Sequence, residues 1–258
     1  MKNTIVLGTI GVAASFAMLA FGYLAGAGGR PAPQMAAAGG LDRGAIEQIV
    51  RDYLINNPEI MLEVQEALSV REEAAKKVLR LETIRQSSDV IFNADYDGVI
   101  GNPDASVTVV EFFDYNCGYC KRAVNDMQKL IADNADVRFV MKEFPILGPD
   151  SQRAAQVSMA FRKLAPDSYA DFHLKLLGAP GRATEQSAMK LALSYGVDEA
   201  ELREGMKDPA IAQAIGETYE LASNLSITGT PSYVVGEEVI FGAIGHQILQ
   251  QKIAEVRD

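Results

Sequence analysis

The chain has 258 residues, 48% of them hydrophobic, so it can bury a substantial core in one good-sized domain with extensions or in two small domains. Its formal net charge is −10. This charge argues against a general nucleic-acid binder, which needs a basic patch to offset phosphate charge, so we expect no nucleic-acid partner.

The first residues indicate export from the cytoplasm. Lys2 precedes a stretch, residues 3–29, without any charged side chain, and a cation before an apolar run is typical of an export signal. Because the run is long enough to span a bilayer, residues 1–27 are predicted to be a signal peptide or a retained anchor. Small-residue sites favour cleavage, and recurring glycine disfavours the alternative of a buried soluble helix. Residues 28–40, rich in glycine, alanine and proline, predict a flexible linker.

Residues 41–88 predict a helical segment in two parts. Apolar residues recur at helical spacing in the first part, and Asn57 and Pro58 then suit the N-cap and first position of a second helix that runs to about Gln86. The second helix carries a narrow apolar stripe on a charged surface, and such a stripe needs a partner surface. That surface is either the chain's own domain or a second copy, and we favour self-association.

The character of the sequence changes after about residue 88. VTVVEFF at 107–113 predicts a central buried strand, and VRFVMKEFP at 137–145 predicts a second one. The helix between them completes a βαβ unit. Residues 151–222 predict a mostly helical insertion. SYVV and EVIF, joined by a turn, then predict a β-hairpin, and a final helix is expected over 244–256.

Cys117 and Cys120 are the only cysteines, and they open the helix of the βαβ unit. A helix N-terminus carries unpaired N–H groups and positive partial charge, which favour the reactive thiolate. We therefore expect Cys117 to be an exposed nucleophile and Cys120 to be a more buried resolving thiol. The alternatives are a structural disulfide, a zinc site and a two-thiolate Cu(I) site. His173 and His246 lie far apart in the sequence, which argues against zinc.

The segments VVEFFDYNCGYCKR and TGTPSYVV together resemble the DsbA-like branch of the thioredoxin superfamily. The resemblance implies an α/β thioredoxin fold over residues 89–258, with a helical insertion and a preceding N-terminal helical oligomerisation segment. It further implies that Pro231 is cis and faces the CxxC, and that the backbone of Thr230 pairs with substrate. The substrate-binding residues expected on this basis are Gly118, Tyr119, Thr230 and Pro231.

Glu111 lies inside an otherwise apolar strand, where a carboxylate is unfavourable unless it is paired or neutral. It resembles the buried acid that lies beneath the active site of this family. The resemblance implies that Glu111 is a third catalytic residue, assisting proton transfer from Cys120. Lys142, in the neighbouring strand, is a candidate partner for Glu111, and a solvent-facing position is the alternative.

The dipeptide between the cysteines departs from the strongly oxidising members of this branch, which have a histidine there. Gly118 and Tyr119 take its place, which predicts a higher Cys117 pKa and a less oxidising couple than in those members. CGYC with Thr-Pro resembles the periplasmic disulfide isomerases. AIEQIVRDYLINNPEIMLEVQEAL, from residue 45, resembles the N-terminal segment of the suppressor-of-copper-sensitivity C proteins, which implies trimerisation.

These observations together predict an exported protein thiol–disulfide oxidoreductase of the bacterial periplasm. We expect a disulfide isomerase or reductase that acts on cysteine-containing envelope proteins, assembles as a homotrimer and depends on a membrane redox partner. No cofactor or metal is expected. The alternatives are a DsbA-like dithiol oxidase and a Cu(I)-binding protein or chaperone.

Overall fold

The computed structural model describes residues 42–257, so the predicted export segment (1–27) and linker (28–40) lie outside the described residues. The chain divides into two compact units, which part between Gln65 and Glu66. Among residues 42–257, no helix has both the length and the apolar character needed to cross a membrane.

The first unit contains α1 (Arg43–Asn56) and the first residues of α2 (Ile60–Gln86). Asp42 caps α1 by accepting a hydrogen bond of 2.8 Å from the Ala45 N–H. The expectation that Asn57 caps the second helix was wrong. Its side-chain amide instead donates to the Tyr53 carbonyl (2.8 Å) at the end of α1, and α2 begins at Ile60. No residue of α1 is buried.

The rest of α2 belongs to the second unit and ends against the β-hairpin. Ile84 and Arg80 are its buried residues. The Arg85 guanidinium donates to the Glu237 carboxylate (2.8 Å), and the Arg80 guanidinium lies 5.4 Å from the centre of the Phe241 ring. The boundary between the helical oligomerisation segment (41–88) and the thioredoxin domain (89–258) stays a prediction.

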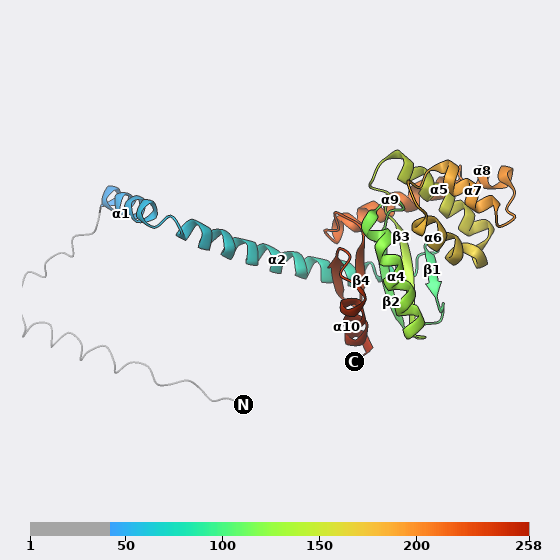
Figure 1. Cartoon of the computed structure of the whole chain (residues 1–258). Helices are drawn as coiled ribbons and strands as arrows, with labels where there is room; N and C mark the ends of the chain where they lie inside the picture. Colours follow the sequence, from blue (N-terminus) through green and yellow to red (C-terminus); the bar gives the residue numbers. More distant parts are fainter. Residues whose placement is uncertain (1–41, 258) are drawn as a thin grey trace, which may run out of the picture. The chain divides into compact units, whose positions relative to one another are not determined.

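The second unit is built on a five-stranded sheet in the order β1-β3-β2-β4-β5 (Figure 1). Strands β2 and β3 are parallel, and the other neighbouring pairs are antiparallel. The strands are β1 (Gly98–Gly101), β2 (Val107–Phe113), β3 (Val137–Glu143), β4 (Ser232–Val235) and β5 (Glu238–Phe241). The helices are α3 (Ser88–Phe92), α4 (Gly118–Asp133), α5 (Pro149–Leu164), a 3-10 turn (Pro166–Ser168), α6 (Tyr169–Gly178), α7 (Glu185–Leu193), α8 (Glu199–Gly205), α9 (Pro209–Asn224) and α10 (His246–Arg257).

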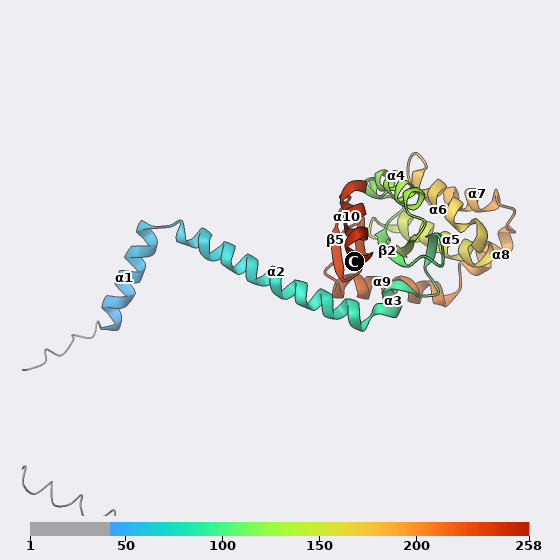
Figure 2. The same cartoon turned by 90° about the horizontal axis from the view of Figure 1, so that it is seen from below.

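Alternation along the central strands divides the core between two faces of the sheet. Side chains at odd positions, such as Val109 and Phe139, pack with α4, α6 and α10. Side chains at even positions, such as Val110 and Val140, pack with Ile84, α3 and α9. Figure 2 shows α4 and α10 on one side of the sheet and α3 and α9 on the other. Both faces are covered, which explains the nearly continuous apolar runs of β2 and β3.

The predicted thioredoxin fold with a helical insertion is confirmed. β2, α4 and β3 form the predicted βαβ unit, and α5–α9 form the insertion between β3 and β4. Figure 1 shows α5–α8 gathered to one side of the sheet. β1 and α3 were not predicted from the sequence. β1 is only four residues long and holds Gly98, where the Tyr169 ring lies 1.9 Å from the position that a Cβ would take.

Candidate redox site

The two cysteines lie where β2 ends and α4 begins. The Cys117 N–H donates to the Asp114 carbonyl (3.0 Å), which closes the turn after the strand. Cys117 is the N-cap of α4, and its Sγ accepts a hydrogen bond from the Cys120 N–H (3.4 Å). Both cysteines are free thiols. The predicted placement at the first turn of the helix is confirmed.

Cys117 is less accessible than the sequence suggested. Only 6% of its surface is exposed, and Cys120 is fully buried. The thiol of Cys117 donates to the Thr230 carbonyl oxygen at 3.1 Å, so the loop before β4 covers it. The expectation of an exposed nucleophile was therefore wrong, whereas the deeper position of Cys120 is as expected.

The pKa of Cys117 is lowered to about 5. The largest cause is the hydrogen bond from the Cys120 side chain; burial opposes it, and the Thr230 side chain and the N–H groups of Cys120 and Tyr119 add to the lowering. The Thr230 carbonyl acts in the other direction, because it accepts from a thiol and repels a thiolate. The balance favours a thiolate at neutral pH, and the thiolate is the nucleophilic form.

The pKa values of Cys120 and Glu111 are raised, in the opposite direction from that of Cys117. Burial raises the pKa of Cys120 well above its usual range, and the hydrogen bond with Cys117 and the charge of Glu111 raise it further. Burial, followed by the charge of Cys117, raises the pKa of Glu111 to about 8. Both carboxylate oxygens of Glu111 are buried and have no hydrogen-bond partner among residues 42–257. A neutral acid therefore lies beside the buried thiol of Cys120 at pH 7.

Lys142 is not the partner of Glu111, and it does not face solvent. It pairs with Phe112 in the parallel register, whereas Glu111 pairs with Met141, so the two side chains lie on opposite faces of the sheet. Lys142 is completely buried and forms an ion pair with Asp97, which is buried beside β1. Burial lowers the pKa of Lys142 and raises that of Asp97, while their mutual attraction opposes both shifts.

The exposed dipeptide between the cysteines and the half-buried Thr230 border the site, whereas Pro231 is buried. The Thr230–Pro231 peptide bond is cis, as the resemblance implies. Gly118 is exposed, and 60% of the surface of Tyr119 is accessible. Cys117, the dipeptide and Thr230 come together, since the Cys117 thiol donates to the Thr230 carbonyl. Their role in binding substrate stays a prediction.

Sequence reasoning missed the residues that fix this turn against the helical insertion. The side-chain amide of Asn116 donates to the Ala183 carbonyl (2.9 Å), and the Ala183 N–H donates to the side-chain oxygen of Asn116 (2.7 Å). The Asp114 carboxylate accepts from the Asn116 N–H and the Ser151 hydroxyl, both at 2.7 Å. Asn116 directly precedes Cys117, but its partner lies 67 residues away in sequence, so no local pattern indicates the contact.

Lys121 also binds this part of the insertion, the loop of residues 179–183. Its ammonium group donates to the carbonyl oxygens of Ala179 (2.8 Å) and Gly181 (2.9 Å). Lys121 and Asn116 flank the two cysteines in sequence, so loop 179–183 is tied to both ends of the CxxC. The insertion thereby forms one wall of the site.

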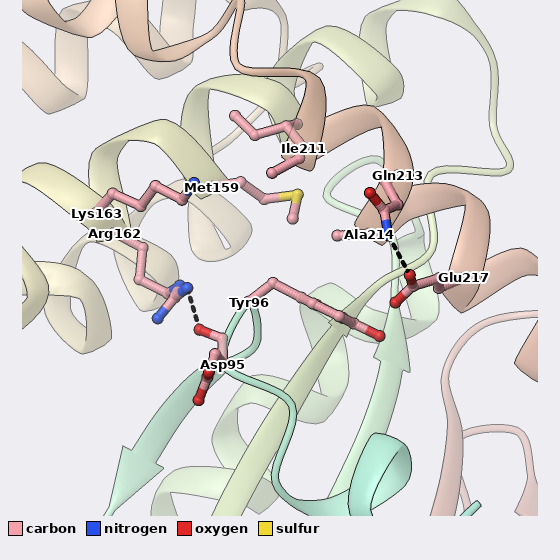
Figure 3. Close-up of a pocket in the computed structure, with 10 residues that line it drawn as sticks. Asp95, Tyr96, Met159, Arg162, Lys163, Ile211, Gln213, Ala214 and Glu217 are labelled. Atoms are coloured by element: carbon pink, nitrogen blue, oxygen red, sulfur yellow. Dashed lines mark hydrogen bonds between the residues drawn. The ribbon is translucent and has the colours of Figure 1, made fainter.

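Two further features lie apart from the cysteines. A cavity of about 370 Å³ is lined by α5, α9 and residues 95–96, and it contains none of the predicted site residues (Figure 3). Over residues 42–257, no group of three or more His, Cys, Asp and Glu side chains could hold a metal ion. The His173 ring is buried, and its Nδ1 lies 3.1 Å from the Tyr115 hydroxyl. Burial lowers the pKa of His173 to about 3.

The fold and the paired thiols define a thiol–disulfide oxidoreductase with a CxxC centre at Cys117 and Cys120. The chain belongs to the family described as DSBA-like thioredoxin domain, which its residues 108–254 match. Residues 42–75 match the N-terminal domain of the copper resistance protein ScsC. The two matches together make it an oxidoreductase of the DsbA and ScsC type.

Three relatives illustrate this membership. Disulfide bond formation protein D of Bacillus subtilis is 33% identical over 153 residues, which span 55% of this chain and 68% of that protein. A thioredoxin-like oxidoreductase from Silicibacter pomeroyi is 38% identical, with a TM-score of 0.62 over 66% of this chain and 96% of that one. Proteus mirabilis ScsC in a transitional conformation is 28% identical, with a TM-score of 0.61 over 83% of this chain and 95% of that one.

Proposed function

We propose that this oxidoreductase is a protein disulfide isomerase and reductase of the bacterial periplasm, acting on cysteine-containing envelope proteins. The Cys117 thiolate attacks one sulfur of a substrate disulfide. The substrate S–S bond breaks, a mixed disulfide with Cys117 forms, and the other substrate sulfur leaves as a thiolate that takes up a proton. The observation that carries this step is the lowered pKa of a thiol that is held at the start of α4.

The mixed disulfide has two outcomes. Another thiolate of the substrate attacks the bonded substrate sulfur and expels Cys117 as a thiolate, which is isomerisation without net redox change. Alternatively, Cys120 loses its proton and attacks Cys117. This releases the substrate as a thiolate and leaves the Cys117–Cys120 disulfide, so the substrate is reduced by two electrons. Glu111 is the proposed acceptor of the Cys120 proton. Once Cys117 is bonded to substrate, its thiolate charge no longer raises the pKa of Glu111, so the carboxyl group ionises more readily and can then accept that proton. A membrane redox partner would then reduce the protein's disulfide.

Substrate recognition is proposed to use the border of the site. The backbone of Thr230 would pair with an extended substrate segment as an added strand, beside Pro231. Gly118 is exposed and leaves room for substrate beside Cys117, while Tyr119 offers an accessible ring. This mode needs only extended backbone and one disulfide, so it suits many different protein substrates.

The isomerase role draws its support from the N-terminal segment. α1 contains no buried residue although it carries Ile46, Ile49, Val50 and Tyr53, and 55% of the surface of Ile49 is exposed. Exposed apolar residues at helical spacing favour association with another surface. We propose that residues 41–88 assemble the protein as a homotrimer. Several active sites in one particle would let a substrate be attacked repeatedly until its disulfides are correct.

Dithiol oxidation is the second candidate function. A lowered Cys117 pKa stabilises the reduced form of the protein, and a couple with a stabilised reduced form is a stronger oxidant. The same two cysteines would then pass their disulfide to reduced substrates. The expectation of a less oxidising couple than in histidine-containing relatives stays a prediction.

Two assays on the protein from residue 28 onward separate these candidates. The first follows recovery of a small secreted enzyme whose disulfides have been scrambled, and the second follows oxidation of the same enzyme in its reduced form. An isomerase accelerates the first more than the second. Faster oxidation without recovery from the scrambled state would make the protein an oxidase. Cys117→Ser is the control, since it removes the nucleophile from both reactions.

A further inference from the structure

The exposed dipeptide between the cysteines lies beneath an arginine. The guanidinium carbon of Arg122 is 4.2 Å from the centre of the Tyr119 ring. One terminal nitrogen of Arg122 lies 4.0 Å from the position that a Cβ on Gly118 would take. Arg122 is exposed. Its charge is therefore fixed over the residues that directly follow the nucleophile Cys117.

Arg122 has no carboxylate partner among the described residues. None of the ion pairs or side-chain hydrogen bonds within residues 42–257 involves it. Arginines of the helical insertion differ: Arg153 pairs with Glu185 (2.8 Å), and Arg182 pairs with Asp150 (3.1 Å). A cation–π contact with Tyr119 does not use the guanidinium N–H groups as hydrogen-bond donors to a carboxylate, so they can donate to a substrate.

Lys121 binds two carbonyl oxygens rather than a carboxylate. Asp126 follows Arg122 by four residues on α4, but the two side chains form no ion pair. Arg122 therefore presents a positive charge beside the dipeptide in a chain whose net charge is −10. Local charge of one sign beside a reactive group favours substrates of the opposite sign.

The reach of an extended substrate fits this geometry. Consecutive Cα atoms are about 3.8 Å apart, and an extended chain advances about 3.3 Å per residue. A substrate sulfur bonded to Cys117 therefore brings side chains one or two residues away over the Gly118–Tyr119 dipeptide. A carboxylate at such a position can accept a two-pronged hydrogen bond from a guanidinium edge, which an ammonium group cannot offer.

We propose that Arg122 is a specificity-determining residue that selects substrates with an aspartate or glutamate within two residues of the reacting cysteine. This inference rests on the proposed thiol–disulfide exchange and names a substrate class for it. Tyr119 holds the guanidinium in place by stacking. The contact strengthens capture of the substrate in the step in which the Cys117 thiolate displaces one substrate sulfur as a thiolate.

The test uses three cyclic peptides that each contain one disulfide and differ only in the residue next to the first cysteine, which is Glu, Gln or Lys. The fully reduced protein is mixed with each peptide, and the second-order rate of peptide reduction is measured in a single turnover. Reduction of one peptide disulfide oxidises one Cys117–Cys120 pair, so no further reductant is needed.

We expect the wild-type protein to reduce the Glu peptide about threefold faster than the Gln peptide, as an exposed ion pair allows, and the Lys peptide more slowly than either. In Arg122→Gln the Glu-to-Gln rate ratio falls to about one. Arg122→Lys retains part of it because the charge remains. Lys129→Gln, which removes an exposed cation further along α4, keeps the wild-type ratio. Salt at 1 M lowers the wild-type ratio toward one.

Each ratio is taken within one variant, so any change in the reactivity of Cys117 itself cancels. Equal wild-type rates for the Glu and Gln peptides would overturn the inference and leave the proposed exchange intact. A ratio that persists in Arg122→Gln would overturn the assignment to Arg122. Failure of the reduced wild-type protein to reduce any of the peptides would instead contradict the proposed function itself.

Discussion

α1 and α4 are amphipathic helices of 14 and 16 residues, and they differ in what covers their apolar side chains. α4 buries Ala123, Val124, Met127 and Leu130 against the sheet and α10, and this packing fixes the cysteines at its first turn. No residue of α1 is buried among residues 42–65, the described part of its unit. The comparison shows that an apolar stripe indicates the need for a partner surface but does not identify that surface. For α4 the partner lies in the same chain, and for α1 we propose other copies of the chain.

The variant Cys117→Ser is expected to separate the roles of α4 and α1 most clearly. Exchange should fall below detection, because serine offers no thiolate, while association through α1 continues. Cys120→Ser should instead accumulate a mixed disulfide with substrate, since the resolving thiol is absent. Mass spectrometry under non-reducing conditions detects that species. A Cys117→Ser protein that still reduces peptide disulfides would refute the assigned nucleophile.

The next largest effect should come from the buried ion pair of the second unit. Lys142→Met leaves the Asp97 carboxylate buried without its partner, and we expect a loss of about 3–5 kcal/mol in the free energy of unfolding. Urea denaturation measures it. Arg85→Gln breaks an exposed pair with Glu237 and should leave that free energy almost unchanged. Equal effects from the two variants would contradict the burial of Lys142.

A smaller effect is expected from pH acting on Cys117. A free cysteine is a few per cent thiolate at pH 7, whereas a thiol with a pKa of about 5 is almost fully ionised, so the rate at which iodoacetamide alkylates Cys117 should already have reached its plateau at pH 7. The rate should be half-maximal near pH 5. Because the folded-state pKa lies below the unfolded value, the stability that the thiolate contributes is present above the unfolded pKa and is lost as pH falls through about 5. A midpoint near pH 8 would contradict the lowered pKa.

Asn116→Ala should have a modest effect, centred on the loop beside the cysteines. It removes the hydrogen bonds to Ala183 and Ser151, and we expect a loss of about 1–2 kcal/mol in the free energy of unfolding. Limited proteolysis should then cut loop 179–183 sooner than in the wild type. Gln48→Ala, at an exposed position of α1, serves as the control. If loop 179–183 is cut no sooner in Asn116→Ala than in this control, Asn116 does not hold the loop.

Local patterns predicted the parts of the fold that local forces determine. Continuous apolar runs gave β2 and β3, and turn residues gave the hairpin of β4 and β5. β1 was not predicted, because four residues with a glycine at each end give no strand signal. The Asp97 partner of Lys142 and the Ala183 partner of Asn116 are 45 and 67 residues away, so only the folded chain brings them together. Cys117 is covered for the same reason, because Thr230 lies 113 residues further on.

The central claim is that α1 assembles copies of a reactive domain into an isomerase. Light scattering of the protein from residue 28 onward tests it most directly, beside recovery of a scrambled substrate, with the variant Ile46→Glu/Val50→Glu and the control Gln48→Glu. We predict that wild type and control have the mass of three chains and restore the substrate, whereas the variant has the mass of one chain, still reduces peptides and no longer restores it. A wild-type protein with the mass of one chain, or a single-chain variant that restores the substrate at the wild-type rate, would contradict the claim.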